Sequence, residues 1–163
     1  MAISFVRIDD RIIHGQIVTR WAMEKPCDGI LAVNDKAANN PILKSALKSA
    51  SSKKTLIYTY EEFLTKIDQA MSSDKNYFLI TKDPLMMAKL LTETNLKIET
   101  DVVNVGPQSA RPDTVNVNQN ADITKEEIVA YEKLVDAGFT IDFQLVPDGK
   151  SVLWNNVRST LIK

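Results

Sequence analysis

The sequence predicts a single α/β domain with an open, doubly wound and mostly parallel sheet that carries helices on both faces. Short apolar runs alternate with segments of helical periodicity along the chain. Helix-capping residues stand in front of several of the helical segments. The length of 163 residues suits one domain with a sizeable core. We therefore expect residues 1–163 to form one domain.

Seven short segments are rich in apolar residues and are the expected strands. In chain order they are residues 3–8, 30–33, 55–58, 77–80, 102–105, 114–117 and 139–146. The first five are apolar runs separated by helical segments, which is the alternation of a parallel sheet. The last one alternates apolar and polar residues, so we expect it at an edge of the sheet.

The expected helices lie between and after these strands. They begin near residues 15, 41, 60, 84, 125 and 151, and the first of them ends near residue 24. Four have a marked start, in which an N-cap residue is followed by a favourable first-turn residue: Asn40 with Pro41, Thr59 with Glu62, Asp83 with Pro84, and Thr124 with Glu127. Gly138 is the expected end of the fifth helix, and the last helix is expected over 151–161.

The first strand-to-helix loop concentrates reactive groups. Residues 7–16, RIDDRIIHGQ, contain the only histidine, two arginines, two aspartates and a glycine. Right-handed crossovers bring such loops to one end of the sheet, where these folds bind ligands. The set is suited to holding a transferable phosphoryl group. A second long loop, residues 105–122, is either another binding element or a plain surface excursion.

His14 is the candidate nucleophile of this loop. An imidazole titrates near pH 6.5, and its neutral nitrogen can form a covalent phosphoryl intermediate. Arg11 can bind phosphoryl oxygens with two parallel hydrogen bonds, and Arg7 adds a second positive charge. The amides of Gly15 and Gln16 would begin the helix, where anions bind. The alternative is a loop histidine without chemistry.

The two carboxylates do not suit a phosphate ligand, because they would repel it. Asp9 and Asp10 are therefore expected to orient Arg7, Arg11 or the imidazole, or to shape the turn. Cys27 is the only cysteine, so an internal disulfide is excluded and a reducing cytosol is favoured. One cysteine and one histidine are too few for a protein-only zinc site, and we expect no metal.

Composition excludes other classes of function. The net charge of −1 gives no basic footprint for nucleic acid. No apolar run reaches the roughly 18 residues of a membrane span, and no secretory signal begins the chain. A nucleotide-binding domain is disfavoured because neither G-x-G-x-x-G nor a P-loop motif follows any expected strand.

Residues 6–18, VRIDDRIIHGQIV, closely resemble the phosphorylation-site segment of enzyme IIB of the mannose/fructose/sorbose class of the sugar phosphotransferase system. That family typically has (A/V)RIDDRLIHGQV at this point. The likeness continues through residues 19–21 and 30–35. Residues 101–111, DVVNVGPQSAR, are similar to the family's NVGGMAxR loop. Length and alternation also fit, so the resemblance covers essentially the whole chain.

The resemblance implies a phosphocarrier, that is, a transferase acting between a protein phosphohistidine and a sugar. Such a IIB protein takes its phosphoryl group from the phosphohistidine of a IIA protein or domain and holds it on a histidine Nδ1. It then passes the group to a sugar that enters through membrane components IIC and IID. It needs no cofactor. The implied location is the cytoplasm, peripherally associated with the membrane permease, and a homodimer is left open.

Carried onto this sequence, the resemblance makes His14 the phosphorylated residue. Arg11 and the backbone from Asp10 to Gln16 would form the phosphate cradle, with Arg7 as support. Arg111 stands where the family has an arginine. One departure is Gly106-Pro107 in place of a Gly-Gly pair, because proline removes a backbone donor. This departure motivates an alternative function, a regulatory or sugar-sensing IIB paralogue that is not coupled to transport.

Overall fold

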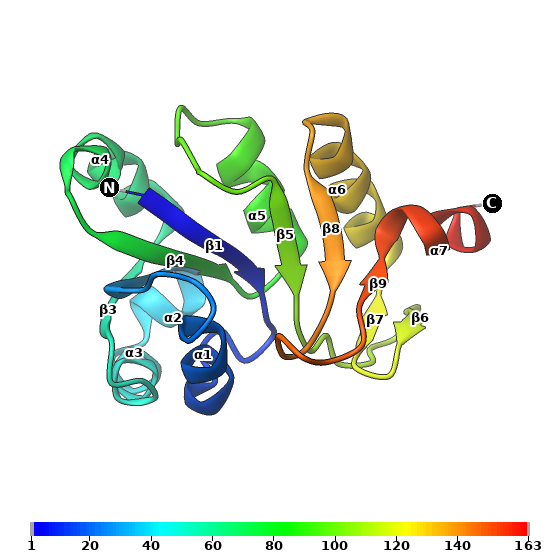
Figure 1. Ribbon diagram of the computed structural model, residues 1–163, viewed down its shortest axis with the longest axis horizontal. Coiled ribbons are helices and arrows are strands. Elements are labelled where there is room, and N and C mark those ends of the chain that lie inside the picture. Colours follow the sequence, from blue (N-terminus) through cyan, green and yellow to red (C-terminus); the bar gives the residue numbers. More distant parts are fainter. Residues whose placement is uncertain (1, 163) are drawn as a thin grey trace.

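The centre of the molecule is a seven-stranded sheet (Figure 1). The computed structural model describes residues 2–162. Its strands are β1 (Ala2–Ile8), β2 (Gly29–Val33), β3 (Lys54–Tyr58), β4 (Asn76–Thr81), β5 (Val102–Val105), β8 (Thr140–Phe143) and β9 (Val152–Leu153). They lie in the order β3-β2-β4-β1-β5-β8-β9, all parallel except β9, which runs antiparallel to β8. The expected open, mostly parallel sheet is confirmed.

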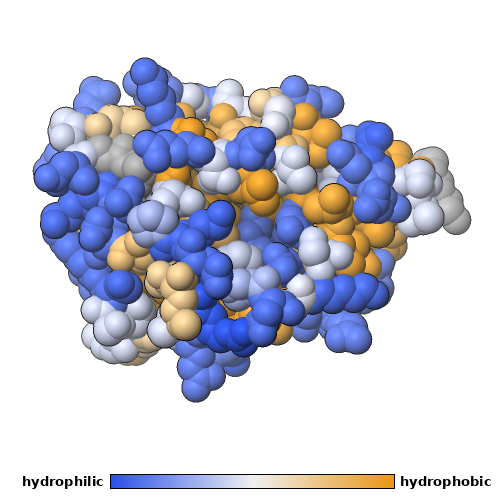
Figure 2. Space-filling view, viewed as in Figure 1, coloured by the Kyte–Doolittle hydropathy of each residue, from blue (hydrophilic) through white to orange (hydrophobic). Residues whose placement is uncertain are grey.

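Helices cover both faces of this sheet, as expected (Figure 1). They are α1 (Gly15–Ala22), α2 (Asp35–Asn39), α3 (Pro41–Ser49), α4 (Tyr60–Ser72), α5 (Pro84–Thr92), α6 (Lys125–Asp136) and α7 (Trp154–Leu161). Buried residues form two clusters, one under α1–α3 and one under α4–α7. The first layer covers only β1–β4, and hydrophobic side chains show at the surface in the half of this face over β8 and β9 (Figure 2).

The expected helix starts are confirmed by their hydrogen bonds. Thr59 and Thr124 both form complete capping boxes with the glutamate three residues later. The side chains of Asn40 and Asp83 accept amide hydrogen bonds from the first turns of α3 and α5. Gly138 follows α6 with φ of +100°, a conformation that favours glycine.

Two expectations at the carboxyl-terminal end are wrong. The strand expected over 139–146 is shorter and lies inside the sheet, because β9 pairs along its free side. The helix expected over 151–161 begins only at Trp154, since Val152 and Leu153 are taken into that edge strand. A two-residue strand is too short to be recognised from its own sequence pattern. The short helix α2 was not expected either.

The long loop after β5 contains a hairpin. The strand expected over 114–117 is present as β6 (Val115–Asn118), but it lies outside the main sheet. It pairs antiparallel with β7 (Ala121–Ile123), which was not expected. The backbone of Gln108 joins the hairpin, donating to the carbonyl of Asn120 and accepting from the amide of Asp122 at 2.9 Å each. The loop is therefore a folded element.

Within residues 2–162, no helix combines the length and the apolar content that a membrane crossing requires. Cys27 is half-buried beside the α1–α3 core, where its Sγ lies 3.5 Å from the carbonyl oxygen of Gly29. Burial raises the pKa of this thiol. The side chain thus contributes to packing.

Candidate active site

The site lies where the sheet changes its winding direction. From β1 the chain crosses through α1 to β2 on one side, whereas from β5 it crosses through α6 to β8 on the other side. Since β1 and β5 are neighbours, the loops that follow them diverge and leave a crevice between them. These two loops carry His14 and Arg111, the residues expected from the sequence. In this type of fold, the ligand is therefore expected in the crevice between these two loops.

The loop from Asp9 to His14 is held by two buried isoleucines. Ile12 and Ile13 are each only 5% exposed and pack in the core under α1–α3. Ile12 has φ of 63°, which is unusual for a β-branched residue and stores backbone strain. This strained turn directs the two apolar side chains inward and leaves Arg11 exposed and His14 partly exposed. Burial of the isoleucines fixes the direction of the polar groups.

His14 and Arg11 lie side by side at the rim of this loop. Arg11 Nη1 is 3.3 Å from His14 Nδ1. A guanidinium can only donate, so this hydrogen bond forms in the tautomer that has its ring proton on Nε2 and its lone pair on Nδ1. The positive charge of Arg11 thus lies beside Nδ1. Sequence reasoning expected this pair, and the structure brings it together.

The amino end of α1 supplies hydrogen-bond donors next to His14. His14 is the N-cap residue, and no side chain caps this end of the helix. The amides of Gly15, Gln16 and Ile17 therefore have no partner within the helix, which is the arrangement that binds anions at helix amino ends. Gly15 is required by packing, because a Cβ there would clash with the backbone carbonyl of Ala50 at the end of α3.

The backbone amides closer to β1 already donate hydrogen bonds within the protein. Fewer amides than expected therefore remain to bind a phosphate. The amide of Asp10 donates to the carbonyl of Pro107 at 3.0 Å, and that of Arg11 donates to Asp9 Oδ1 at 2.9 Å. Those of Ile12 and Ile13 donate to backbone carbonyls within the loop. Of the backbone expected from Asp10 to Gln16, only the part that begins the helix has free donors.

Arg7 does not lie in the cradle, contrary to the sequence expectation. Its side chain points into the protein and is 2% exposed, with Nη2 3.0 Å from Asp9 Oδ2. Its other donors reach the Asn104 side chain and the carbonyls of Gln144 and Leu145. The guanidinium joins the loop after β1, strand β5 and the loop after β8. Arg7 thus stabilises the arrangement of these three segments, and its buried side chain is not available to a phosphate.

The ion pair of Arg7 and Asp9 is enclosed by backbone. Removal from water lowers the pKa of Arg7 and raises the pKa of Asp9, while the attraction between the two charges opposes both shifts. Gly106 lies directly against the pair, and a Cβ at this position would clash with the Arg7 guanidinium. The glycine that opens the second loop is therefore required by the buried arginine.

Asp10 connects the two loops. Its Oδ2 accepts hydrogen bonds from the amide of Ser109 at 2.8 Å and from the Ser109 hydroxyl. The carboxylate thus fixes the second loop beside His14 rather than binding a phosphate. This supports the expectation that the aspartates shape the turn, and it removes the Asp10 side chain and amide from the phosphate ligands.

Arg111 is also committed to other partners. Its two terminal nitrogens contact both oxygens of Glu127, at 3.1 and 2.8 Å, and it donates to the carbonyls of Ser109 and Asp122. The hydrogen bond with Glu127 raises the pKa of Arg111. Arg111 lines the neighbouring hollow of about 380 Å³, not the one that contains His14. Arg111 therefore fixes the second loop against α6 through Glu127.

His14 itself opens into a hollow of about 460 Å³. The walls come from the first loop, from Pro107 and Ser109 of the second, from Asn120 of the hairpin, and from Leu145 after β8. The hollow is wide and open, so the His14 side chain is accessible to a large partner.

Comparison with known proteins identifies the family. The model of the PTS system sorbose subfamily IIB component matches residues 3–161. The chain is a PTS IIB component of the mannose/fructose/sorbose class. It is 28% identical over 155 residues to the fructose-specific EIIB component of Bacillus subtilis, covering 93% of this chain and 92% of the relative. This confirms the predicted family and the assignment to phosphotransferases of sugar transport.

Two further similarities concern domain arrangement and fold. The mannose-specific EIIAB component of Escherichia coli K12 is 27% identical over 148 residues, which is 90% of this chain but 45% of that longer protein. The crystal structure of the IIBSor domain of the Klebsiella pneumoniae sorbose permease superposes with a TM-score of 0.88 at 22% identity, covering 100% of both chains. The second likeness confirms the predicted fold.

Three residues of this IIB component matter to the site and were missed from the sequence. The Asn104 side chain and the Gln144 carbonyl both accept hydrogen bonds from the Arg7 guanidinium. The Asn104 side chain also donates to the Gln144 carbonyl, which fixes the loop after β8. Ser109 holds Asp10. Asn104 could have been noticed as the one polar residue in an otherwise apolar strand, whereas nothing in the sequence pattern signals Ser109.

Proposed function

We propose that this IIB component carries a phosphoryl group on His14 Nδ1, taken from a IIA phosphohistidine and passed to a sugar. The observation that carries the proposal is the juxtaposition of His14 Nδ1, the Arg11 guanidinium and the amino end of α1 at one open hollow. Phosphoryl transfer depends mainly on positioning and on stabilising charge, and this arrangement supplies both.

The first transfer exchanges one nitrogen–phosphorus bond for another. The lone pair of His14 Nδ1 attacks phosphorus in line, the bond to the donor imidazole breaks, and the electron pair returns to that imidazole nitrogen. Arg11 and the amides of Gly15, Gln16 and Ile17 stabilise the charge on the three phosphoryl oxygens. In the second transfer the sugar hydroxyl oxygen forms the new bond to phosphorus, the bond from phosphorus to Nδ1 breaks and returns its electron pair to Nδ1, and the hydroxyl proton is released to solvent.

The proposed partners follow from the same exchange. A IIA protein or domain is the donor, and the two-part mannose-specific relative supports this pairing by its name. Membrane components IIC and IID present the sugar, so residues 1–163 act as one cytoplasmic unit at the permease. We leave a homodimer open. The sugar would be chosen by the membrane components.

A reconstituted relay tests this proposal. The chain is incubated with phosphoenolpyruvate, the general phosphotransferase proteins and a cognate IIA, and the modified residue is mapped by mass spectrometry under alkaline conditions. We expect one phosphoryl group per chain, on His14. A phosphoryl group on any other residue contradicts the proposal.

The regulatory paralogue is distinguished by a second assay. Gly106-Pro107 motivates this alternative, and in the structure the Pro107 carbonyl accepts from the Asp10 amide, so the altered loop still packs against the first. When membrane vesicles containing IIC and IID are added to phosphorylated protein, a transport component loses its label to the sugar. A regulatory paralogue keeps its label.

Replacing Arg11 with lysine should slow phosphorylation by at least tenfold, or about 1.4 kcal/mol. A lysine ammonium is a point charge and cannot hold two phosphoryl oxygens with the fixed geometry of a guanidinium. The rate is measured by rapid quench with phosphorylated IIA. Because Arg11 is exposed, the melting temperature should change little. Arg158→Lys, far from the hollow on α7, is the matched control, and an unchanged rate in Arg11→Lys would mean that its guanidinium does not touch the phosphoryl group.

Titration with cognate IIA should shift amide resonances around His14 and residues 105–113. Two imidazoles must approach the same phosphorus, so the partner has to cover the hollow at His14. Rapid release requires a modest interface of about 1,200 Å² or less, and association should weaken as salt increases. ¹⁵N NMR checks both points. Shifts confined to residues 140–143 and the adjacent edge would place the partner surface elsewhere.

A further inference from the structure

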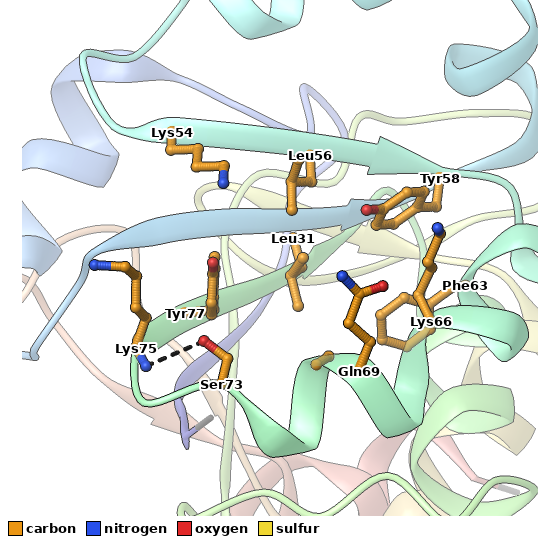
Figure 3. A pocket seen from close by; sticks show the side chains of 11 residues that line it. Leu31, Lys54, Leu56, Tyr58, Phe63, Lys66, Gln69, Ser73, Lys75 and Tyr77 are labelled. Atoms are coloured by element: carbon orange, nitrogen blue, oxygen red, sulfur yellow. Dashed lines mark hydrogen bonds between the residues drawn. The ribbon is translucent and has the colours of Figure 1, made fainter.

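A second hollow lies at the β3 edge of the sheet, away from the crevice between β1 and β5 that holds His14. Figure 3 shows the residues that line it. It has a volume of about 320 Å³ and lies between α4 and the strands β2, β3 and β4. None of the residues that line it lines the hollow at His14. Because β3 is an edge strand, the hollow is open to solvent along one side. The phosphoryl-transfer proposal makes no use of it.

The floor of this hollow is apolar and well packed. Leu31 and Phe63 are 2% and 0% exposed, and Leu56 projects from the edge strand beside them. The ring of Tyr77 is fixed against the backbone of Gly29, where a Cβ would clash with it. The Tyr58 ring lies 6.2 Å from that of Phe63. The floor can therefore contact a flat ring without rearrangement.

The rim carries positive charge only. Lys54, Lys66 and Lys75 line the hollow, and no carboxylate does so. None of them belongs to the ion pairs found within residues 2–162. Figure 3 shows Lys54 on β3 and Lys66 on α4 toward opposite ends of the hollow, whereas the Lys75 side chain points away from Tyr77. Lysines outside any of these ion pairs at the rim favour an anion there.

Hydrogen-bonding groups complete the lining. The Gln69 amide projects from α4 toward the sheet between Leu31 and the Lys66 side chain (Figure 3). Burial raises the pKa of Tyr58, so its hydroxyl remains protonated and can donate. An amide and phenols beside an apolar floor suit a ring that carries hydroxyl or similar polar substituents.

We propose that this hollow binds a small phosphomonoester whose body is a single ring. The ring lies over Leu31, Leu56 and Phe63, and the phosphate dianion lies at the rim, where the long side chains of Lys54 and Lys66 can turn toward it. Lysine binds phosphate as a point charge, and a dianion matches more than one ammonium group better than a carboxylate does. The volume is at the lower end of the range for ligand sites, which suits one ring and one phosphate.

Amide shifts on ¹⁵N-labelled protein test the proposal with phenyl phosphate, glucose 6-phosphate and inorganic phosphate. The two ring esters distinguish an aromatic from a sugar body. We expect at least one ester to shift resonances of residues 54–58 and 63–75, with a Kd at least tenfold lower than that of inorganic phosphate. The double variant Lys54→Gln/Lys66→Gln should weaken this binding at least tenfold.

The matched control is Lys36→Gln/Lys48→Gln, which removes the same charge from two exposed lysines in the opposite helix layer. It should leave binding unchanged. Equal affinity for inorganic phosphate, equal loss in both double variants, or shifts limited to residues 11–17 would each overturn the proposal. Because phosphorylation of His14 is measured separately, failure of this binding is distinguishable from failure of the phosphocarrier function.

Discussion

Replacing His14 with alanine should abolish the phosphoryl label completely. His14 is the only histidine in the chain, and its Nδ1 is the proposed nucleophile beside Arg11 and the amino end of α1. Without it, Arg11 and the amides can still bind phosphate but cannot form a nitrogen–phosphorus bond. Incubation with radiolabelled phosphoenolpyruvate and the upstream relay proteins measures the label.

The nature of the label provides a further check. A phosphorylated histidine is stable in base and labile in acid, which separates it from a phosphate ester on serine or threonine. The imidazole is partly exposed, so His14→Ala should keep the melting temperature within a few degrees of the parent protein. His14→Gln serves as a second variant of closer size. Any acid-labile label that persists in either variant would contradict the assignment of His14 as the phosphorylated residue.

Replacing Asp9 with asparagine should produce the largest loss of stability, about 3–5 kcal/mol. The substitution removes the charge partner of Arg7, whose side chain is 2% exposed and 3.0 Å from Asp9 Oδ2. The guanidinium would then be buried without a counter-charge. It also weakens the hydrogen bond from the Arg11 amide that shapes the turn before His14. Urea denaturation followed by circular dichroism measures the change.

An exposed ion pair is the matched control for Asp9→Asn. Lys133 and Glu93 lie 3.4 Å apart with about half of each side chain exposed. Solvent screens such a pair, so Lys133→Gln should cost less than about 1 kcal/mol. If Asp9→Asn costs no more than this control, the buried pair is not what holds β5 and the loops after β1 and β8 together. A phosphorylation rate measured below the unfolding range would then show whether the turn at His14 was disturbed.

The second loop stays in place although this chain has Gly106-Pro107 where the family usually has a Gly-Gly pair. Pro107 lacks an amide hydrogen, but its carbonyl accepts the hydrogen bond from Asp10. Ser109 adds a second connection through the Asp10 carboxylate. Two contacts thus join the loops on either side of the crevice without using the missing donor. The residue before proline, Gly106, remains essential because it lies against Arg7.

Local physical chemistry determined most of the fold. Strands 3–8, 30–33, 55–58 and 77–80 are apolar because helices cover both faces of the sheet there, so their pattern depends little on distant partners. The helix starts depend on residues within four positions of one another, and the cap hydrogen bonds of Asn40, Thr59, Asp83 and Thr124 are present as expected. The sequence likewise identified His14 and Arg11, three residues apart, as neighbours.

Only the tertiary structure decided which charged residues are free to act. Arg7 on β1 and Asp9 just after it are two residues apart and point to the same side, but their burial depends on Gly106, Asn104 and the loop after β8, nearly a hundred or more residues away. Arg111 is likewise directed by Glu127 on α6. A guanidinium is the same group in the sequence whether it faces a phosphate or a carboxylate. Its partner is fixed by long-range packing and desolvation, which short-range patterns do not contain.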